Sequence, residues 1–570
     1  MPGEAVTLQL GQFAGCVGAH WWGLQAAALR SPAEAAELSP AALFRTGRAA
    51  GGRETLTPRL VALELKGGVG AVSPGGAGPE APVAWDGEVA AYLECAGGSA
   101  PRDAGRRTED ASSDVKGRSS TSLQGASRAP GTSPAPSRLA VSQEVYSGGS
   151  VQVWSDYLNV HLHPKSVYVI RQYLHDGDCG CLEAFGQGES LLQDPGCVEE
   201  LEDRLHFYVE ECDYLQGFQV LCDLHNGFSG VGAKVTELLH DEYSGKGILT
   251  WGLTPVTSDE EDCQKNFYRL MNAALGIVHL TSHSSLFCPL SLGGSLGIKP
   301  QPPVAFPYIN YDASLNYHSS AILAAALDTL TAPYRLCSSQ GSMMHLAETL
   351  NFCGRKVVAA WASVPFPAPH GYSLADTLCA YQEDVPWKLL SSCREQKVSC
   401  CFAQSVVLRG IHKESHISSC RGKQPASPLH MCDSTEEILQ RYLHTLFPGA
   451  FSTSHVLEQP CHTLPPYPQF FSPLLTRQGF LQDKPPHHSS AAVESIPVLA
   501  ALQSSPVLHT LLSSLYKDLQ KLNTRRWPSF FSAGIEQGDF QEALEELRTL
   551  SQCYETGFEA DESEDEADSD

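Results

Sequence analysis

The 570-residue chain lacks the segments that place a protein across a membrane or export it. No run approaches the roughly 18 consecutive apolar residues that a membrane-spanning helix needs. The first residues lack the basic and apolar regions of a secretory signal, and Glu4 and the scarcity of arginine before Arg30 are unlike a matrix-targeting peptide. We therefore expect any membrane association to be peripheral.

Basic residues are also scarce: 39 Lys and Arg stand against 64 Asp and Glu, for a net charge of −25. Such a chain repels phosphate backbones, and no local basic patch stands out, so nucleic-acid binding is not expected. The 19 cysteines include no paired CxxC motifs at zinc spacing. His161 and His163 form a His-x-His pair without a third ligand, which is more often structural than metal-binding. We predict no metal site.

Large apolar residues are almost absent from 96–141, where Ser, Gly, Ala, Pro and Arg dominate, which predicts a disordered insert. The acidic block at the end is expected to stay disordered by self-repulsion. The sequence predicts one domain formed by 1–95 and 148–300, interrupted by an insert at 96–147. A second α/β domain with long loops at 301–500, C-terminal helices at 501–556 and an acidic tail at 557–570 follow.

What the chain does contain is a repeated order of strand, glycine turn and helix. A strand at Phe218–Leu224 leads into a glycine-rich turn at 225–232, a helix from about Ala233 to Tyr243 and a strand at Ile248–Leu253. Such a turn directs backbone N–H groups and a helix dipole at a phosphate. Ala233 stands where a Walker A lysine would be, and the pattern is not GxGxxG, so a turn without a ligand explains it equally well.

The N-terminus has the same order. Val6, Leu8 and Leu10 alternate with polar residues as in a strand, Gly11 and Gln12 form a turn, and an apolar helical stretch follows. Residues 55–65 predict a further strand. We expect strands at 6–10 and 218–223 to lie in one Rossmann-like parallel sheet with helices on both faces.

Several segments of the chain resemble tubulin. The clearest match is Cys212-Asp213-Tyr214-Leu215-Gln216-Gly217-Phe218-Gln219, which precedes the glycine-rich turn as it does in tubulins. Gly11, Gln12, Gly18 and Trp22 fall on the tubulin N-terminal pattern, and the resemblance extends to the acidic end. It implies an α/β fold with a Rossmann-type parallel sheet domain, a second α/β domain and C-terminal helices.

The resemblance also implies the residues of a nucleotide site, with GTP as the cofactor. The residues that would lie against its phosphates are Gly11, Gln12, Gly18, Asn226, Gly227, Ser229, Gly230 and Gly232. The tubulin loop whose acids activate water on a neighbouring subunit matches Gly341–Glu348, where Glu348 is the one carboxylate that remains. An exposed helix glutamate with no catalytic role is the favoured alternative.

The departures from tubulin gather on the nucleotide-handling loops. His225 and Phe228 carry side chains where tubulin has glycine in close approach to phosphate. His161 and His163 replace carboxylates that help to hold magnesium, and Mg²⁺ prefers oxygen ligands. The asparagine that reads guanine falls near Ser291. These departures favour a protein that is not an enzyme and leave GTP binding open.

His20-Trp21-Trp22 and the segment from Glu210 to Gln219, followed by Asn226–Ala233, identify the chain as a member of the Misato family of tubulin-like proteins. The family implies control of mitochondrial distribution, morphology and fusion, exerted from the cytoplasm at the mitochondrial outer membrane through protein partners. Two alternatives stay open: a GTP-binding GTPase that polymerises, and a tubulin-folding or spindle microtubule cofactor that engages tubulin or its chaperones.

Overall fold

A computed structural model describes residues 2–30, 37–48, 54–70, 153–175, 180–257, 263–299, 301–338, 341–381, 385–393, 400–412, 427–484 and 492–556. The predicted insert at 96–147 and the predicted tail at 557–570 lie outside these ranges.

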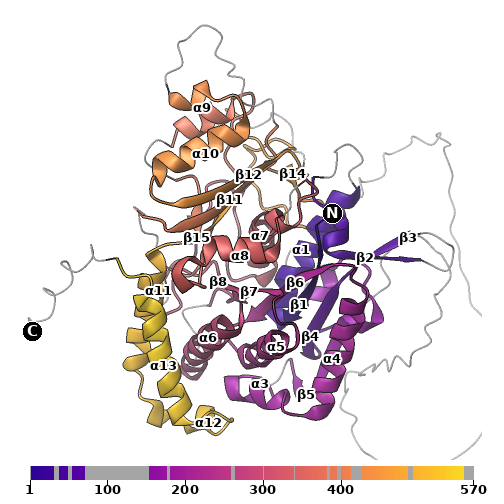
Figure 1. The fold of residues 1–570 in the computed structure, drawn as a ribbon, viewed down its shortest axis with the longest axis vertical. Helices are drawn as coiled ribbons and strands as arrows, with labels where there is room; N and C mark the ends of the chain where they lie inside the picture. The colour runs from indigo at the N-terminus through magenta and orange to yellow at the C-terminus, as the bar shows by residue number, and fades with distance from the viewer. Residues whose placement is uncertain are drawn as a thin grey trace, which may run out of the picture. The chain divides into compact units, whose positions relative to one another are not determined.

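The first half of the fold is a six-stranded sheet in which every neighbouring pair is parallel (Figure 1). Its order is β5-β4-β1-β6-β7-β8. The strands are β1 Glu4–Leu10, β4 Leu60–Lys66, β5 Val167–Leu174, β6 Leu215–Asp223, β7 Gly247–Leu253 and β8 Leu286–Leu290. β6 and β7 are buried along their whole length, as expected for parallel strands covered on both faces.

Two expectations about these strands are confirmed and one is wrong. β1 pairs with β6, with Val6 opposite Phe218, and β7 follows in the same sheet. The strand predicted at 55–65 is two strands instead. β3 Glu54–Pro58 forms a hairpin with β2 Phe44–Arg48, and β4 begins only at Leu60. Pro58 has no N–H with which to continue a ladder, so the first strand ends there.

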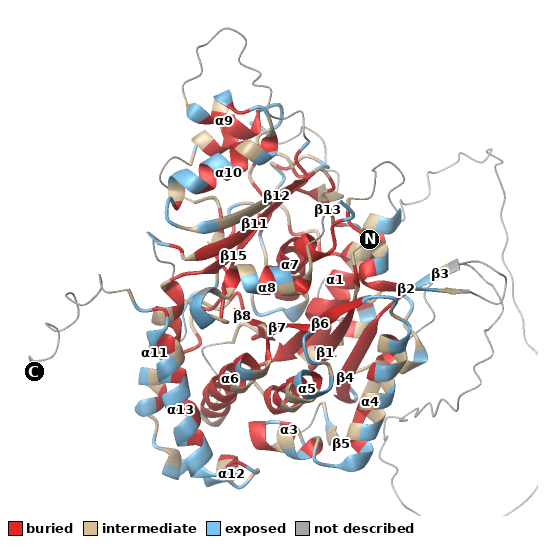
Figure 2. Cartoon of the chain, viewed as in Figure 1, coloured by how far each residue is buried: buried red, intermediate tan, exposed pale blue. Residues whose placement is uncertain are grey.

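Helices cover both faces of this sheet. One face carries α1 Gln12–Arg30, α7 Asn316–Leu330 and α8 Met343–Leu350, whose apolar residues join Leu221 and Leu249 in one core. The opposite face carries α3 Phe185–Leu191, α4 Pro195–Glu210, α5 Phe228–Glu242 and α6 Cys263–His283, which join Val220 and Ile248 in another. Figure 2 shows the buried residues gathered along the strands and on the inner sides of these helices.

The helix after the glycine-rich turn begins earlier than predicted. α5 starts at Phe228, not near Ala233, so the second half of the expected turn is the first turn of the helix. The side chain of Asn226 accepts a hydrogen bond from the backbone N–H of Phe228 at 2.9 Å, which starts the helix at that residue.

The second half of the fold is a mixed five-stranded sheet of order β10-β9-β15-β11-β12. Its strands are β9 Ala359–Ser363, β10 Lys388–Leu389, β11 Ala403–Arg409, β12 Phe451–Leu457 and β15 Val498–Ser504. β11 and β12 are parallel and the other pairs antiparallel. The same half of the fold contains the helices α9 Leu374–Cys379 and α10 Thr435–Leu446. It also contains a separate two-stranded sheet, in which β13 Cys461–His462 pairs with β14 Ser495–Ile496.

The C-terminal helices are α11 Val507–Gln520, α12 Pro528–Phe531 and α13 Gln537–Gln552. They begin after β15, which extends across residue 501, where the sequence places the start of the helical part. Short 3₁₀ turns lie at Pro40–Ala42, Trp154–Tyr157, Pro164–Ser166, Ala332–Tyr334, Phe352–Gly354, Pro428–Met431 and Thr524–Arg526. The fold is the expected α/β class, with a parallel sheet domain, a second α/β sheet and C-terminal helices.

Candidate functional site

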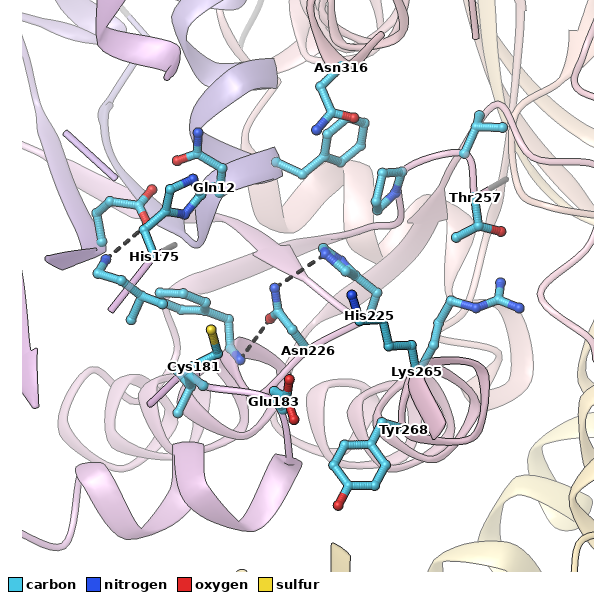
Figure 3. Close-up of a pocket in the computed structure, with 18 of the residues that line it drawn as sticks. Gln12, His175, Cys181, Glu183, His225, Asn226, Thr257, Lys265, Tyr268 and Asn316 are labelled. Carbon is cyan, nitrogen blue, oxygen red and sulfur yellow. Dashed lines mark hydrogen bonds between the residues drawn. The ribbon is translucent and has the colours of Figure 1, made fainter. Parts of the chain in front are cut away.

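A cavity of about 770 Å³ lies at the carboxyl ends of the parallel strands (Figure 3). The strand order reverses between β1 and β6, because β4 lies on one side of β1 and β7 lies beyond β6. Such a switch point is where open α/β sheets bind ligands. The lining residues are Gln12, Phe13, Glu64, Leu65, His175, Cys181, Leu182, Glu183, His225, Asn226, Phe228, Pro255, Val256, Thr257, Gln264, Lys265, Tyr268, Arg269, Ser314 and Asn316.

The N-terminus of α1, which faces this cavity, is already occupied by a carboxylate of the same chain. Asp223, at the end of β6, accepts hydrogen bonds from the backbone N–H of Ala14 at 2.7 Å and of Phe13 at 3.1 Å. Its side chain is fully buried. A helix N-terminus offers free N–H groups and a positive dipole to an anion, and here Asp223 is that anion.

Two further helices that begin at the cavity, α5 and α3, are capped in the same way. Asn226 accepts from the N–H of Phe228 at the start of α5. Asn272, in the middle of α6, accepts from the N–H of Phe185 at the start of α3 at 2.8 Å, and its amide donates to the carbonyl oxygens of Glu183 and His225. The chain's own side chains therefore take N–H groups at each of these helix starts.

Burial shifts the ionisation of the acids around the cavity. It raises the pKa of Asp223 to about 7, against the opposing effect of the hydrogen bonds from Ala14 and Phe13. Burial likewise raises the pKa of Glu64 to about 8, although the N–H of Leu65 and the indole of Trp154 donate to its carboxylate. Near neutral pH, Asp223 and Glu64 therefore carry less negative charge than two ordinary carboxylates would.

The basic groups lie on the opposite wall and in the turn. Burial, followed by the charge of Arg269, lowers the pKa of His225 to about 4, so this imidazole is neutral at physiological pH. Lys265 and Arg269 on α6 supply the positive charge of the lining. The Oε1 atom of Gln12 and the Nδ1 atom of His225 are buried with no hydrogen-bond partner among the described residues, so a ligand could bond to them.

Of the eight residues predicted to hold phosphate, the structure places Gln12 and Asn226 on the cavity wall. Gly11 has a φ of +105° and lies against Asp223, where an added Cβ would approach the Oδ2 atom to 2.5 Å. Gly18 packs against the side chain of Gln9. The phosphate roles of these residues stay predictions.

The remaining predicted glycines are explained by helix packing. A Cβ on Gly230 would collide with the carbonyl oxygen of Phe185, and one on Gly227 would come within 2.8 Å of the carbonyl oxygen of Ala184. Gly232 packs against the sulfur of Cys222, and the hydroxyl of Ser229 donates to the carbonyl oxygen of Asn226. Because Gly227 and Gly230 have no side chain, the segment that begins α3 can pack closely against the start of α5.

Glu348 lies at the other end of the sheet. It is exposed on α8, and the N–H of Met343 at the start of that helix donates to the side chain of Gln216, near the beginning of β6. Glu348 does not line the cavity at the carboxyl ends. Its catalytic role stays a prediction.

Of the two histidines and the serine considered in the sequence, His161 is exposed, whereas His163 and Ser291 have structural contacts. His163 accepts a hydrogen bond from the N–H of Lys165 and stacks on Phe207. Ser291 is buried, accepts from the N–H of Gly293 and lies outside the cavity lining. Within the described ranges, no group of three or more His, Cys, Asp or Glu residues could hold a metal ion.

Sequence reasoning missed Asp223, Asn272 and Asn316. Asp223 is the one acid in the run from Phe218 to Leu224, a signal that was visible in the sequence. Asn316 begins α7 and lines the cavity, whereas the expected asparagine position near Ser291 does not. Asn272 lies in the segment Leu270–Leu275, which resembles a tubulin helix, but only the fold shows that the middle of α6 meets the start of α3.

A parallel sheet with a cavity at its switch point, followed by a second sheet and C-terminal helices, defines a tubulin-like protein. Residues 144–336 match the Tubulin domain family, and residues 3–123 match the Misato Segment II tubulin-like domain. The part of the chain that the structure describes contains no helix long and apolar enough to cross a membrane.

The chain is similar to full-length relatives as well. It is 52% identical over 566 residues to "Protein misato homolog 1" of Homo sapiens, covering 97% of this chain and 98% of the relative. The protein of the same name from Danio rerio is 43% identical, with 99% of both chains covered. "Protein misato" of Drosophila melanogaster is 28% identical, with 97% of this chain and 98% of the relative covered. The chain belongs to the Misato family.

Proposed function

We propose that this tubulin-like protein controls the distribution, morphology and fusion of mitochondria through protein partners and does not turn over GTP. It acts from the cytoplasm, associated peripherally with the mitochondrial outer membrane. The mitochondrial part of the proposal rests on what membership of the Misato family implies. The absence of GTP turnover rests on one observation, the carboxylate of Asp223 at the N-terminus of α1.

The position of Asp223 opposes triphosphate binding for two reasons. A phosphate that reaches the N–H groups of Phe13 and Ala14 must break two hydrogen bonds to Asp223. It must also stay beside that buried carboxyl group, whose ionised form repels a phosphate a few ångströms away. The caps at α3 and α5 remove further N–H groups that phosphate oxygens would need.

The cavity itself favours a second candidate, a GTP-binding protein. Its volume of about 770 Å³ is within the range of small-molecule sites, and the buried Oε1 atom of Gln12 lacks a partner among the described residues. The partner proteins of the first candidate include tubulin or its chaperones, as the family implies.

A thermal-shift titration with GTP, GDP and ATP, with and without magnesium, separates the two candidates. A specific ligand at a hundredfold excess over Kd adds about 2.7 kcal/mol of stability and raises the melting temperature. We expect no shift for the wild-type protein. Asp223→Ser frees the N–H groups of α1, so we expect this variant to gain a shift with nucleotide, whereas Asp203→Ser on the exposed side of α4 should not.

A guanine-specific shift of the wild-type protein that Gln12→Ala abolishes would establish the second candidate. The cellular readout is the mitochondrial network after depletion of the protein. We expect depletion to change its distribution and connectivity, and re-expressed Gln12→Ala to restore both, because the cavity is not needed for partner binding. An unchanged network after depletion would contradict the mitochondrial role.

A further inference from the structure

The mixed sheet ends in a strand whose outer edge pairs with none of the described residues. β12 follows β11 as the last strand of the order β10-β9-β15-β11-β12. Its pairing with β11 runs without a register shift from Ala403 opposite Phe451 to Arg409 opposite Leu457. In a parallel pair, each strand directs only some of its backbone N–H and C=O groups at its neighbour. The remaining N–H and C=O groups of β12 point away from β11.

A groove of about 650 Å³ surrounds this edge. β12 contributes Ser452, Thr453, Ser454 and His455, and Ser405 comes from β11. α8 forms one wall with His345 and Thr349, and α10 forms the other with Glu436 and Gln440. Side chains alternate along a strand, so Thr453 and His455 face one side of the sheet and Ser452 and Ser454 face the other. Because residues from both sides line the groove, it extends around the edge of the sheet.

Within the described part of the chain, β12 lacks the features that normally protect an edge strand. Exposed edges usually carry charged side chains, proline, a bulge or a cover. The sequence of β12, FSTSHVL, has no proline and no lysine, arginine or acid, and its pairing has no bulge. Phe451 at its start is 60% exposed.

We propose that the groove around β12 binds an extended segment of a partner protein, which adds to the sheet as a further strand. Strand addition draws its affinity from main-chain hydrogen bonds and its selectivity from the side chains of the groove. The proposal takes from the proposed function only that the protein acts through partners, and it locates the surface on which one partner binds.

The lining indicates the chemistry of that segment. Its floor carries the hydroxyl groups of Ser452, Thr453 and Ser454, which suit small or polar side chains. Glu436 is the one acid on the groove wall, is exposed and has no ion-pair partner among the described residues. We infer that the segment carries a lysine or arginine opposite Glu436.

A second copy of this chain suits the groove less well. Edge-to-edge pairing of two β12 strands would bring the partner's α8 and α10 against the same helices of this chain. A single extended segment carries no such helices and fits between the two walls. The groove continues toward a smaller hollow of about 410 Å³ beside Arg441 and His444, which gives the segment room beyond the strand.

Selection of random 12-residue peptides displayed on phage, followed by fluorescence anisotropy with the best synthetic peptide, tests this proposal. We expect enriched peptides to carry basic residues and to lose affinity when alternate backbone nitrogens are methylated. Thr453→Lys places a charge on the edge and should weaken binding at least about tenfold. Gln172→Lys on β5, the edge of the other sheet, is the matched control and should bind normally.

A second measurement covers the case in which Thr453→Lys disturbs folding. Hydrogen exchange of the wild-type protein with the selected peptide should slow in the amides of Phe451–Leu457 and leave β5 unchanged. Glu436→Gln should weaken basic peptides most at low salt.

Equal binding of methylated and unmethylated peptides, or of wild type and a folded Thr453→Lys, would overturn the proposal. A dimer in sedimentation that Thr453→Lys dissolves would assign the groove to a second copy instead. None of these outcomes depends on the mitochondrial role, which the depletion experiment tests separately.

Discussion

At the scale of single residues, the side chain that decides the character of the cavity is Asp223. Burial penalises its charged form, whereas the N–H groups of Phe13 and Ala14 favour it, and burial prevails. The result is an acid with a pKa of about 7 in the folded protein, compared with an ordinary value of 3.8. Asp223 thus caps the start of α1 with a carboxyl group whose ionisation lowers the stability of the folded protein.

The raised pKa of Asp223 makes a pH-dependent contribution to stability. Between pH 3.8 and about 7 the folded state holds a proton on Asp223 that the unfolded state has lost, so this contribution falls as the pH rises through that range. We expect Asp223→Asn to remove the effect. Urea unfolding at several pH values should show the variant becoming more stable relative to wild type from pH 4 to pH 7.

Asp203, an exposed acid on α4, supplies the control for that series. Its pKa is lowered by the hydrogen bond from Lys165, so Asp203→Asn should lack the rising trend of Asp223→Asn. A constant difference between Asp223→Asn and wild type across this range would show that Asp223 is ionised throughout in the folded protein.

At the scale of elements, the close approach of α3 to α5 explains the glycines of the turn. Gly188 on α3 and Gly230 on α5 each face backbone atoms of the other segment: a Cβ on Gly188 would collide with the carbonyl oxygen of Gly227, and one on Gly230 with that of Phe185. Backbone cannot move aside as a flexible side chain can. The glycine-rich pattern here meets a packing requirement, whether or not a phosphate binds.

Two glycine-to-alanine changes should therefore have opposite effects. We expect Gly230→Ala to destabilise the protein by about 1–3 kcal/mol, because it overpacks the contact between α3 and α5. Gly23→Ala in α1 meets nothing within 4 Å and should stabilise it by about 0.5–1 kcal/mol, since alanine favours a helix. Urea unfolding measures both. A neutral Gly230→Ala would mean that α3 is not packed as described.

Much of this element-level structure was predictable. The tubulin-like segment from Cys212 to Gln219 located β6, and the alternation of Val6, Leu8 and Leu10 located β1; the structure shows that the two strands pair. The start of α5 was not predictable from the glycines, because the side chain of Asn226 decides where the helix begins. The split between β3 and β4 follows from Pro58, a local signal that the strand pattern concealed.

At the scale of the whole molecule, a buried ion cluster joins the two sheets. Asp328 on α7 forms ion pairs with Arg335, at 2.9 Å, and with Arg409 on β11, and it accepts from Gln25 on α1. Burial alone would raise the pKa of Asp328, but Arg409 and Arg335 hold it below its ordinary value. The cluster links the first sheet's helices to the second sheet through one carboxylate.

Removing that carboxylate leaves two buried guanidinium groups without their counter-ion. We expect Asp328→Ala to destabilise the protein by about 3–5 kcal/mol, the usual cost of breaking a buried ion pair. Glu494→Ala breaks the exposed pair with Arg477 and should change stability by at most about 1 kcal/mol. Chemical unfolding compares them. Similar small effects of both changes would mean that the cluster is hydrated.

The sequence by itself determined the family, the α/β class, the strands β1 and β6 and the place of the glycine-rich turn, because buried strands, helix periodicity and motif residues act over short stretches of chain. Only the tertiary structure decided which side chains cap the nearby helix starts and line the cavity. Asp223, Asn272 and Asn316 come from separate elements, and the helix starts that Asp223 and Asn272 cap lie more than eighty residues away along the chain. Hydrogen bonds between such distant residues depend on how the elements pack, and no local pattern specifies them.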